Sequence, residues 1–217
     1  MLALLLWVTN RQTDKLAGET LTPDFSATNG VKIKKRLKQQ RPLTEKQTET
    51  ILLLAKKYRA IAEEPLSTST MTLLDLRIDT IAAALALAKA ANESAWGTSR
   101  LAVKGNNYFG LWCWPSNCGL TTNALLEGKF HKVSRFNAPV DSVKYYAQIL
   151  NSHPAYKKLR DRRFAARVNN TPMTGTLLAG GLLAYSDRGA AYTEELPTMI
   201  RINNLGQFDQ TNLALAP

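Results

Sequence analysis

The sequence predicts a mostly helical α+β fold with a small β or irregular insertion in the middle of the chain. Segments of good helix formers occupy most of the chain on both sides of this insertion. After Lys104 and Gly105 the pattern changes to loops and short candidate strands. The chain has 217 residues, of which 45% are hydrophobic, so it can bury a substantial core.

We divide the chain into an N-terminal extension, a main domain and a C-terminal tail, over residues 1–70, 71–207 and 208–217. In the extension, the basic segment 31–41 is interpreted as a solvated helix whose Ile33 and Leu37 face a core. An electrostatic contact to an anionic polymer is the alternative. A second helix is predicted over 44–62, with Thr44 as its cap.

The main domain is predicted to begin with one continuous helix over 73–91. Its second half, 81–91, is apolar nearly all round, which is typical of a helix buried in the middle of a domain. The segment 129–136 alternates weakly, as an exposed hairpin arm does. Four more helices are predicted, over 140–151, 154–168, 173–184 and 191–203.

The chain is strongly basic. Its formal net charge of +11 comes from 28 Lys and Arg against 17 Asp and Glu. Such a surface attracts a polyanion, whether nucleic acid, an anionic membrane face or an acidic cell-wall polymer. No DNA-reading or RNA-reading motif accompanies the basic residues, so we expect no nucleic-acid partner.

A carboxyl group stands at the end of the apolar helix. If that helix continues, Glu93 shares one face with Trp96, Gly97 and Arg100. A carboxyl group beside an indole and a buried helix is poorly solvated, which favours its protonated form near neutral pH. A general acid for a glycosidic oxygen needs this property. On spacing alone, the alternative is a carboxylate neutralised by Arg100 or Lys89 at a helix surface.

Three blocks of sequence follow one another in a definite order. They are Glu93-Ser-Ala-Trp-Gly-Thr-Ser99, Asn106-Asn-Tyr-Phe-Gly110 and Ala184-Tyr-Ser-Asp187, the last followed by Tyr192. Together they resemble the pattern of peptidoglycan N-acetylglucosaminidases of the glycoside hydrolase family 73 type, although Ser186 stands where the family has Thr. The Trp-Cys…Cys-Gly insertion and the segment 151–156 resemble the Bax-type subgroup of Gram-negative bacteria. The resemblance covers about residues 73–205.

The resemblance implies a lysozyme-like α+β fold, in which a helical lobe and a small β-hairpin lobe flank a cleft for the glycan. It implies that Glu93 is the catalytic acid and that Tyr185 lines the cleft near the reacting sugar. The candidate substrate-binding residues are Trp96, Asn106, Asn107, Tyr108, Phe109 and Tyr192. For Asn106 and Phe109 the alternative is a structural role. Trp112 and Trp114, like Tyr108, either stack on sugar rings or form a hydrophobic cluster beneath the loop.

A second catalytic group is harder to assign. Most glycosidases use a second carboxylate, and Glu127 near the hairpin arm is our preferred base. Asp141 is interpreted as a helix cap and Asp187 as a structural residue. In the alternative mechanism the N-acetyl group of the substrate is the nucleophile, and Tyr185 supports the developing positive charge.

The predicted activity is hydrolysis of the β-1,4 bond between N-acetylglucosamine and N-acetylmuramic acid in peptidoglycan, by a monomer. The basic surface suits this anionic polymer. One alternative is a lytic transglycosylase, which breaks the other linkage and leaves anhydromuramic ends. Another is a peptidoglycan-binding protein that retains the fold without catalysis.

Two cysteines, Cys113 and Cys118, complete the candidate residues. They form either a local disulfide in an oxidising compartment or two free thiols in a reducing one. We favour the disulfide, because peptidoglycan lies outside the cytoplasm. A zinc site would need further ligands, and only His131 and His153 are available, so we expect no metal and no cofactor.

The N-terminus offers little evidence on location. The apolar run 1–8 is too short to span a bilayer, and no transmembrane span is expected. The run lacks a basic start and an evident cleavage site, so it is either the remnant of a secretory segment or a helix that packs on the domain. A place in the cell envelope, periplasmic or secreted, is therefore inferred from the function.

Overall fold

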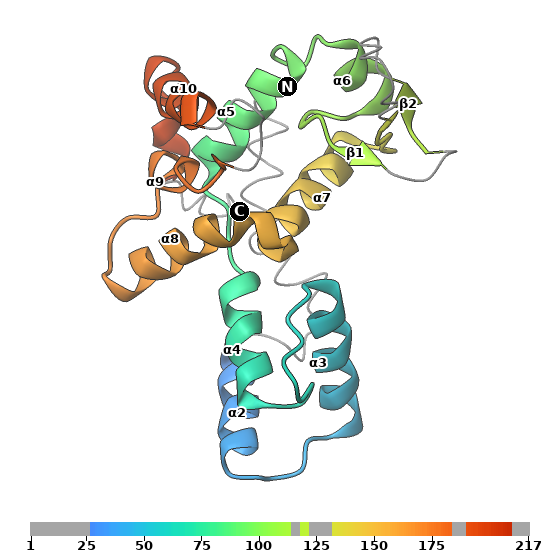
Figure 1. The fold of residues 1–217 in the computed structure, drawn as a ribbon, viewed down its shortest axis with the longest axis vertical. Coiled ribbons are helices and arrows are strands. Elements are labelled where there is room, and N and C mark those ends of the chain that lie inside the picture. The colour runs from blue at the N-terminus through green and yellow to red at the C-terminus, as the bar shows by residue number, and fades with distance from the viewer. Residues whose placement is uncertain (1–26, 114–117, 122–131, 184–189, 210–217) are drawn as a thin grey trace, which may run out of the picture.

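The computed structural model describes residues 27–113, 118–121, 132–183 and 190–209 (Figure 1). The helices are α2 (Ala27–Lys38), α3 (Glu45–Lys57), α4 (Thr68–Arg77), α5 (Ala83–Ser94), α6 (Arg100–Gly105), α7 (Pro139–Ser152), α8 (Lys157–Val168), α9 (Gly175–Ala179) and α10 (Ala190–Ile202), with 3-10 turns η2 (Pro154–Tyr156) and η4 (Leu205–Asp209). The strands β1 (Trp112–Cys113), β2 (Leu120–Thr121) and β3 (Lys132–Val133) form an antiparallel sheet in the order β1-β3-β2. The predicted mostly helical α+β architecture with a small β region is confirmed.

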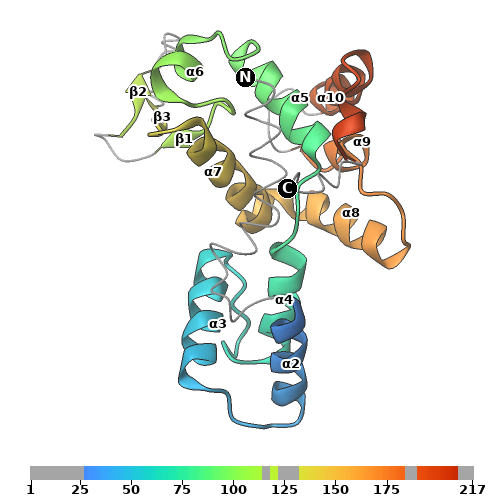
Figure 2. The ribbon, with the colours of Figure 1, turned by 180° about the vertical axis from the view of Figure 1, so that it is seen from behind.

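The first three helices form a unit of their own, which projects from the rest of the molecule in Figures 1 and 2. In α2, Ile33 is 1% exposed, as predicted for the core-facing side of the basic segment. Helix α3 begins after Thr44, which caps it with Gln47 in a reciprocal pair of hydrogen bonds, and it ends at Lys57 rather than at the predicted residue 62. The core of this unit consists of Ile33, Ile51, Leu54, Tyr58, Ala60, Met71 and Leu74. Met71 and Leu74 of α4 belong to this core, so α4 packs with the N-terminal extension although most of it lies beyond the predicted boundary at residue 70. The boundary itself stays a prediction.

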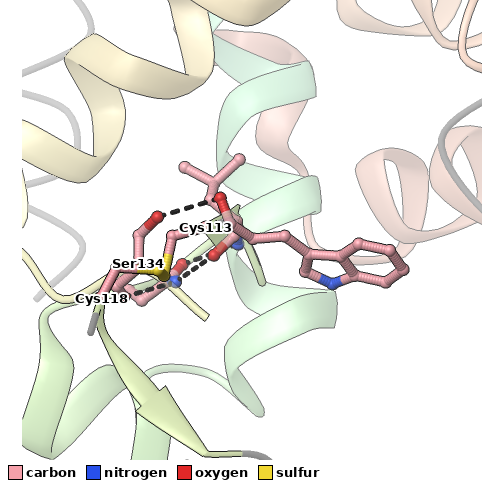
Figure 3. Close-up of a disulfide and its surroundings, with 6 residues drawn as sticks. Cys113, Cys118 and Ser134 are labelled. Carbon is pink, nitrogen blue, oxygen red and sulfur yellow. Dashed lines mark hydrogen bonds between the residues drawn. A yellow bond between two sulfur atoms is a disulfide. The ribbon is translucent and has the colours of Figure 1, made fainter. Parts of the chain in front are cut away.

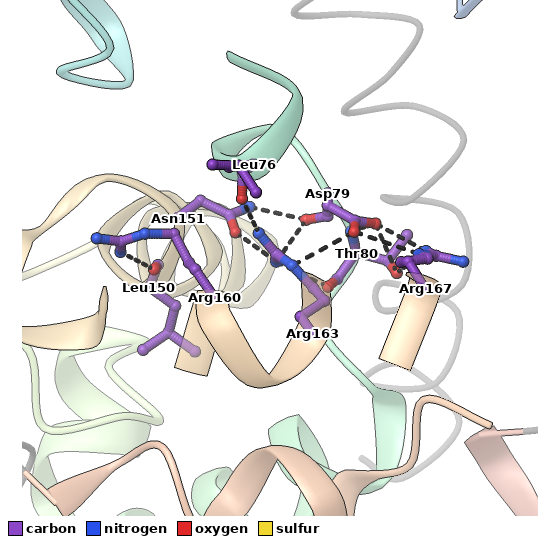
Figure 4. A network of polar contacts seen from close by, with 8 residues as sticks. All are labelled: Leu76, Asp79, Thr80, Leu150, Asn151, Arg160, Arg163 and Arg167. Carbon is purple, nitrogen blue, oxygen red and sulfur yellow. Dashed lines mark hydrogen bonds and ion pairs between the residues drawn. The ribbon is translucent and has the colours of Figure 1, made fainter. Parts of the chain in front are cut away.

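The prediction of one continuous helix over 73–91 is wrong. Helix α4 ends at Arg77 and α5 begins at Ala83. The segment between them turns because Asp79 finds partners elsewhere in the molecule: its carbonyl oxygen accepts hydrogen bonds from Asn151 at 2.9 Å and from Arg163 at 3.2 Å (Figure 4). These bonds replace those that a continuing helix would have made.

Helix α5 lies in the middle of the main lobe and packs against α9, α10 and η4. Every residue from Ala83 to Ala91 is buried, as predicted from its apolar composition. At its start, the carboxylate of Asp209 accepts hydrogen bonds from the backbone N–H of Ala84 at 2.8 Å and of Gly175 at 2.6 Å. The Asp209 side chain thereby joins the beginnings of α5 and α9 to η4, and fixes the start of the helix whose last turn carries Glu93.

The remaining helices follow the predictions with one exception. Helices α7, α8 and α10 occupy the predicted segments, whereas the α-helix in the described residues 173–183 covers Gly175–Ala179. In the part of the chain that the structure describes, no helix is both long enough and apolar enough to cross a bilayer.

Candidate active site

Glu93 lies in the last turn of α5, and the helix does not continue beyond Ser94. Ala95 and Trp96 both adopt left-handed backbone angles, with φ of 49° and 57°, and Gly97 follows with φ of 83°. The predicted shared face of Glu93, Trp96, Gly97 and Arg100 is therefore wrong, because it required an unbroken helix. The chain instead leaves α5 in a tight turn immediately after the carboxylate.

Ser94 holds this turn together. Its hydroxyl donates to the carbonyl oxygen of Ala90 at 2.6 Å and accepts from the backbone N–H of Gly97 at 2.7 Å. Its own carbonyl oxygen accepts from Gly97 at 3.0 Å and from Ser99 at 2.9 Å. Ser94 is 1% exposed, so the serine after the glutamate is a structural clamp that fixes the exit of the helix.

The second sequence block forms a loop tied to the small sheet. Asn107 is buried, and its amide donates to the carbonyl oxygens of Leu111 and Ser134, each at 2.9 Å. The Asn107 side-chain oxygen accepts from the backbone N–H of Leu111 at 3.0 Å. Asn106 donates to the carbonyl oxygens of Phe136 at 3.0 Å and Asn137 at 3.2 Å. Both asparagines therefore fix the loop against the segment that follows β3.

This loop brings Gly110 against Glu93. Gly110 has φ of +64°, and a Cβ added there would lie 3.1 Å from Oε2 of Glu93. Glycine is required by the backbone angle and by the close approach of the carboxylate. Beside it, Phe109 is fully buried and stacks on Tyr146 of α7, with 4.2 Å between the ring centroids. Two blocks that are separate in the sequence thus meet at the Glu93 carboxyl group.

The carboxyl group of Glu93 also forms an ion pair with Lys89, one turn earlier in α5. The side chain of Lys89 is 0% exposed, whereas that of Glu93 is 28% exposed. Burial lowers the pKa of Lys89 to about 8, although the negative charge of Glu93 opposes this shift. Of the two neutralising partners considered from the sequence, Lys89 takes the role, while Arg100 donates to the carbonyl oxygen of Thr121.

A disulfide joins Cys113 to Cys118, as predicted, with 6.1 Å between the Cα atoms. Figure 3 shows it beside Ser134, whose hydroxyl donates to the carbonyl oxygen of Trp112 at 3.1 Å. The disulfide connects the end of β1 to the residue pair before β2. The disulfide therefore joins β1 covalently to the residues that lead into β2, so it links the two outer strands of the small sheet.

Comparison with known protein families shows which family the chain belongs to. The glucosaminidase model, described as mannosyl-glycoprotein endo-beta-N-acetylglucosaminidase, matches residues 75–205, more than half of the chain. The chain belongs to this glucosaminidase family. It is 39% identical over 132 residues to Protein bax of Escherichia coli (strain K12), covering 61% of this chain and 46% of that protein. The chain therefore spans about half the length of this relative.

A solved structure is also similar to the glucosaminidase chain. It is the catalytic domain of the autolysin Auto from Listeria monocytogenes, with a TM-score of 0.45 and 18% identity over 85% of this chain and 98% of that one. The family assignment does not depend on this weaker likeness. The predicted relationship to Bax-type glucosaminidases is confirmed.

Two of the candidate aromatic side chains are exposed. Trp96 is 43% exposed in the turn after Glu93, and Trp112 is 48% exposed in β1. Tyr108 is partly buried and packs against the main core. Of these three side chains, the two tryptophans are the more exposed.

Several predicted site residues lie outside the described part of the glucosaminidase domain. These are Tyr185, Glu127, Trp114 and Asp187; Tyr192 lies in α10, but its side chain is not described. Asp141 is described, and its carboxylate accepts from the backbone N–H of Ala138 at 3.1 Å, which is the predicted helix cap. The second catalytic group therefore stays a prediction.

A cavity of about 320 Å³ lies between α4 and α8. Its lining comprises Asp75, Leu76, Asp79, Arg163, Phe164 and Arg167. Glu93 does not line this cavity, and the cavity's two arginines are paired with Asp79 (Figure 4), so the cavity is separate from the candidate site at the end of α5. Among the described residues, no cluster of three or more histidine, cysteine or acidic side chains could hold a metal ion.

Tyr146 is the neighbour of Glu93 that sequence reasoning missed. It is buried, and burial raises its pKa well above the ordinary value, with the charges of Tyr156 and Glu93 adding to the effect. Nothing in the sequence singles it out, because its position in α7 looks like any other core position.

Proposed function

We propose that the chain is a peptidoglycan hydrolase that cleaves the β-1,4 bond between N-acetylglucosamine and N-acetylmuramic acid, with Glu93 as its general acid. Membership of the glucosaminidase family supports the class of reaction. The observation that carries the role of Glu93 is its placement: a partly exposed carboxyl group at the end of a buried helix, where two of the family's blocks meet. A general acid needs this combination of fixed geometry and access to the substrate.

The surroundings of Glu93 support the proposal further. The Asn107 loop and the Ser94 turn fix the backbone on both sides of the carboxyl group. The exposed indoles of Trp96 and Trp112 are suited to stack on the faces of sugar rings. We therefore propose that Trp96 and Trp112 contact the glycan, and that Asn106, Asn107 and Phe109 shape the loop beneath it.

Two mechanisms remain for the attack on the anomeric carbon. In one, Glu127 activates the attacking water as a general base. In the other, the N-acetyl group of the substrate attacks and Tyr185 supports the positive charge that develops. Hydrolysis is the expected outcome of both, so the proposed activity does not depend on the choice between them.

The disulfide and the surface charge support a location in the cell envelope. A disulfide between Cys113 and Cys118 persists in an oxidising compartment, such as the periplasm or the exterior. A net charge of +11 favours adsorption to the anionic wall polymer.

Substitution of Glu93 tests the proposal. Purified Glu93→Gln and wild-type protein are incubated with peptidoglycan, and the products are analysed by mass spectrometry. We expect the wild type to release fragments with N-acetylglucosamine at the new reducing end, and Glu93→Gln to lose at least about 100-fold in rate, because the amide has no proton to donate. Glu63→Gln, an exposed change in the extension, is the matched control and is expected to retain full rate.

The products distinguish the alternative functions. Fragments with anhydromuramic ends, lighter by one water, would identify a lytic transglycosylase. Binding to peptidoglycan without turnover by the wild type would identify a non-catalytic protein. Full activity of Glu93→Gln would contradict the assigned acid.

A further inference from the structure

Lys89 is a buried cation in direct contact with the proposed acid. Its ammonium Nζ donates to Oε1 of Glu93, and the two residues lie one helical turn apart in α5. Lys89 is enclosed on every side, since its side chain is 0% exposed. Burial of an ammonium is costly, so a lysine at this position needs a physical reason.

The ion pair also raises a problem for the proposed chemistry. In the ion pair the proton is on the Lys89 ammonium, whereas a general acid must itself carry a proton when the substrate arrives. Solvent reaches Glu93, which is 28% exposed, but a bound glycan would cover that surface. A proton source inside the protein would resolve this conflict.

We propose that Lys89 is a positioning residue that holds the Glu93 carboxyl group in place and stores the proton that Glu93 delivers to the glycosidic oxygen. This inference rests on the proposed role of Glu93 as general acid. Before cleavage the proton moves from Nζ to Oε1 along the existing hydrogen bond, so the ammonium becomes an amine and the carboxylate becomes an acid. The total charge of the pair stays at zero.

The remaining protons balance over the cycle. Glu93 donates its proton to the leaving oxygen as the glycosidic bond breaks, and it becomes a carboxylate again while Lys89 is still neutral. In the substrate-assisted mechanism, the water that adds to the sugar gives one proton to Glu93, and this proton returns to Lys89. If Glu127 is the base instead, Glu127 takes that proton and releases it to solvent, and the pair regains one proton from solvent when the product leaves. No other reactant is needed, and the ion pair is restored for the next cycle.

The direction of the first transfer follows from desolvation. When the substrate covers Glu93 it removes the remaining water from the ion pair, and this disfavours two separated charges relative to the neutral pair. Lys89 is already suited to the transfer, since burial lowers its pKa to about 8. An ammonium with this pKa gives up its proton far more readily than an exposed lysine.

Other titratable groups around the pair do not offer the same path. On α7, Tyr146 is buried and its pKa is raised, and Tyr156 of η2 has a pKa raised to about 12 by burial. Asp209 of η4 bonds to the opposite end of α5, at Ala84. On α10, Glu194 and Glu195 are exposed at the surface. Among the described groups, the charge that acts on Lys89 is that of Glu93.

The pH dependence of kcat separates a proton store from a purely mechanical support. We compare wild type, Lys89→Gln and Lys89→Met with the control Lys104→Gln, an exposed change in α6, using soluble peptidoglycan fragments. Lys89→Gln is designed to keep a hydrogen-bond donor without a titratable proton, and Lys89→Met to remove both. We expect kcat in both Lys89 variants to fall by about 10-fold or more, with the alkaline limit of the profile at least about one pH unit lower and KM little changed. Lys104→Gln is expected to keep the wild-type profile.

A second measurement starts from the wild-type protein, so the titration of Lys89 itself can be observed without relying on the folding of a Lys89 variant. Carbon-13 NMR of labelled lysines is expected to show one lysine that titrates near pH 8 and that changes in Glu93→Gln. A profile in Lys89→Gln with an unmoved alkaline limit, or a Lys89 that stays protonated above pH 10 as ordinary lysines do, would overturn the inference. If Glu93→Gln is inactive while Lys89→Gln behaves as the wild type, only this inference fails; if Glu93→Gln is active, the proposed function fails first.

Discussion

Two buried cations of the same molecule are held in opposite ways. At the junction of α4 and α8, Arg163 is 1% exposed and donates to the carbonyl oxygens of Leu76, Asp79 and Thr80 and to the side chain of Asn151, at 2.7–3.2 Å (Figure 4). At the end of α5, the equally buried Lys89 donates to a carboxylate that reaches solvent. Arg163 is bound mainly by backbone carbonyl oxygens, with the Asp79 carboxylate at 3.4 Å as a further partner, whereas Lys89 donates directly to the carboxylate with which we propose it exchanges a proton.

The chemistry of the two side chains explains the difference. The planar guanidinium offers several donors in fixed directions and keeps its charge, so it can join segments that lie far apart. Burial lowers the pKa of Arg163 to about 10, which still leaves it charged at neutral pH. The ammonium of Lys89, with its pKa lowered to about 8, lies close to the range in which it titrates. We interpret the first cation as part of the architecture and the second as part of the site.

Arg163→Leu is expected to have the largest effect on stability. It removes a donor from three partly buried carbonyl oxygens and one partner of the Asp79 carboxylate, which costs about 3–5 kcal/mol in the free energy of unfolding. For a chain of this size, the midpoint of thermal unfolding should fall by about 10 °C. Thermal and urea unfolding measure the loss, with the exposed neighbour Arg162→Leu as the control. A loss no larger than that of Arg162→Leu would show that the network is dispensable.

This network also marks the limit of what the sequence predicts. The apolar run of α5, the Thr44 cap and the cysteine pair are local patterns, and the structure confirms all three. The break between α4 and α5 is not local. Asp79 turns the chain because it bonds to Asn151 and Arg163, which lie 72 and 84 residues further along.

The candidate site divides in the same way. Glu93 and Lys89 are four residues apart, so their pairing was one of the alternatives visible in the sequence. The approach of Gly110 to the carboxyl group depends on the folded loop and could not be predicted from spacing. The exit from α5 was mispredicted because Ala95 and Trp96, which are not glycine, adopt left-handed backbone angles.

Lys89→Met is expected to change stability in the opposite direction. Methionine retains the apolar stem and removes a buried charge, so the free energy of unfolding at pH 7 should rise by about 2 kcal/mol while activity falls. The gain depends on pH. The pKa of Lys89 is about 8 in the folded protein against an ordinary value of 10.5, so the unfolded chain binds more protons between these values, and wild-type stability rises with pH across this window.

The variant lacks this titration. Its advantage over the wild type should therefore be largest below pH 8 and should disappear above about pH 10.5. Urea unfolding at several pH values measures the difference, with the exposed Lys104→Met as the control. If Lys89→Met were less stable than the wild type at pH 7, Lys89 would belong with Arg163 as a structural cation.

Arg167→Gln is expected to have the smallest effect on stability. It compares an exposed arginine partner of Asp79 with the buried partner, Arg163. Arg167 donates to Asp79 at 2.8 Å, but its side chain is 55% exposed, so water competes for both partners. We expect a loss below about 1 kcal/mol. Because salt screens exposed charges, this loss should be measurable at about 0.01 M salt and nearly absent at about 1 M salt, whereas the loss in Arg163→Leu should be present at both concentrations. Urea unfolding at both salt concentrations tests this, and a large, salt-independent loss in Arg167→Gln would mean that Asp79 needs both arginines to hold the turn between α4 and α5.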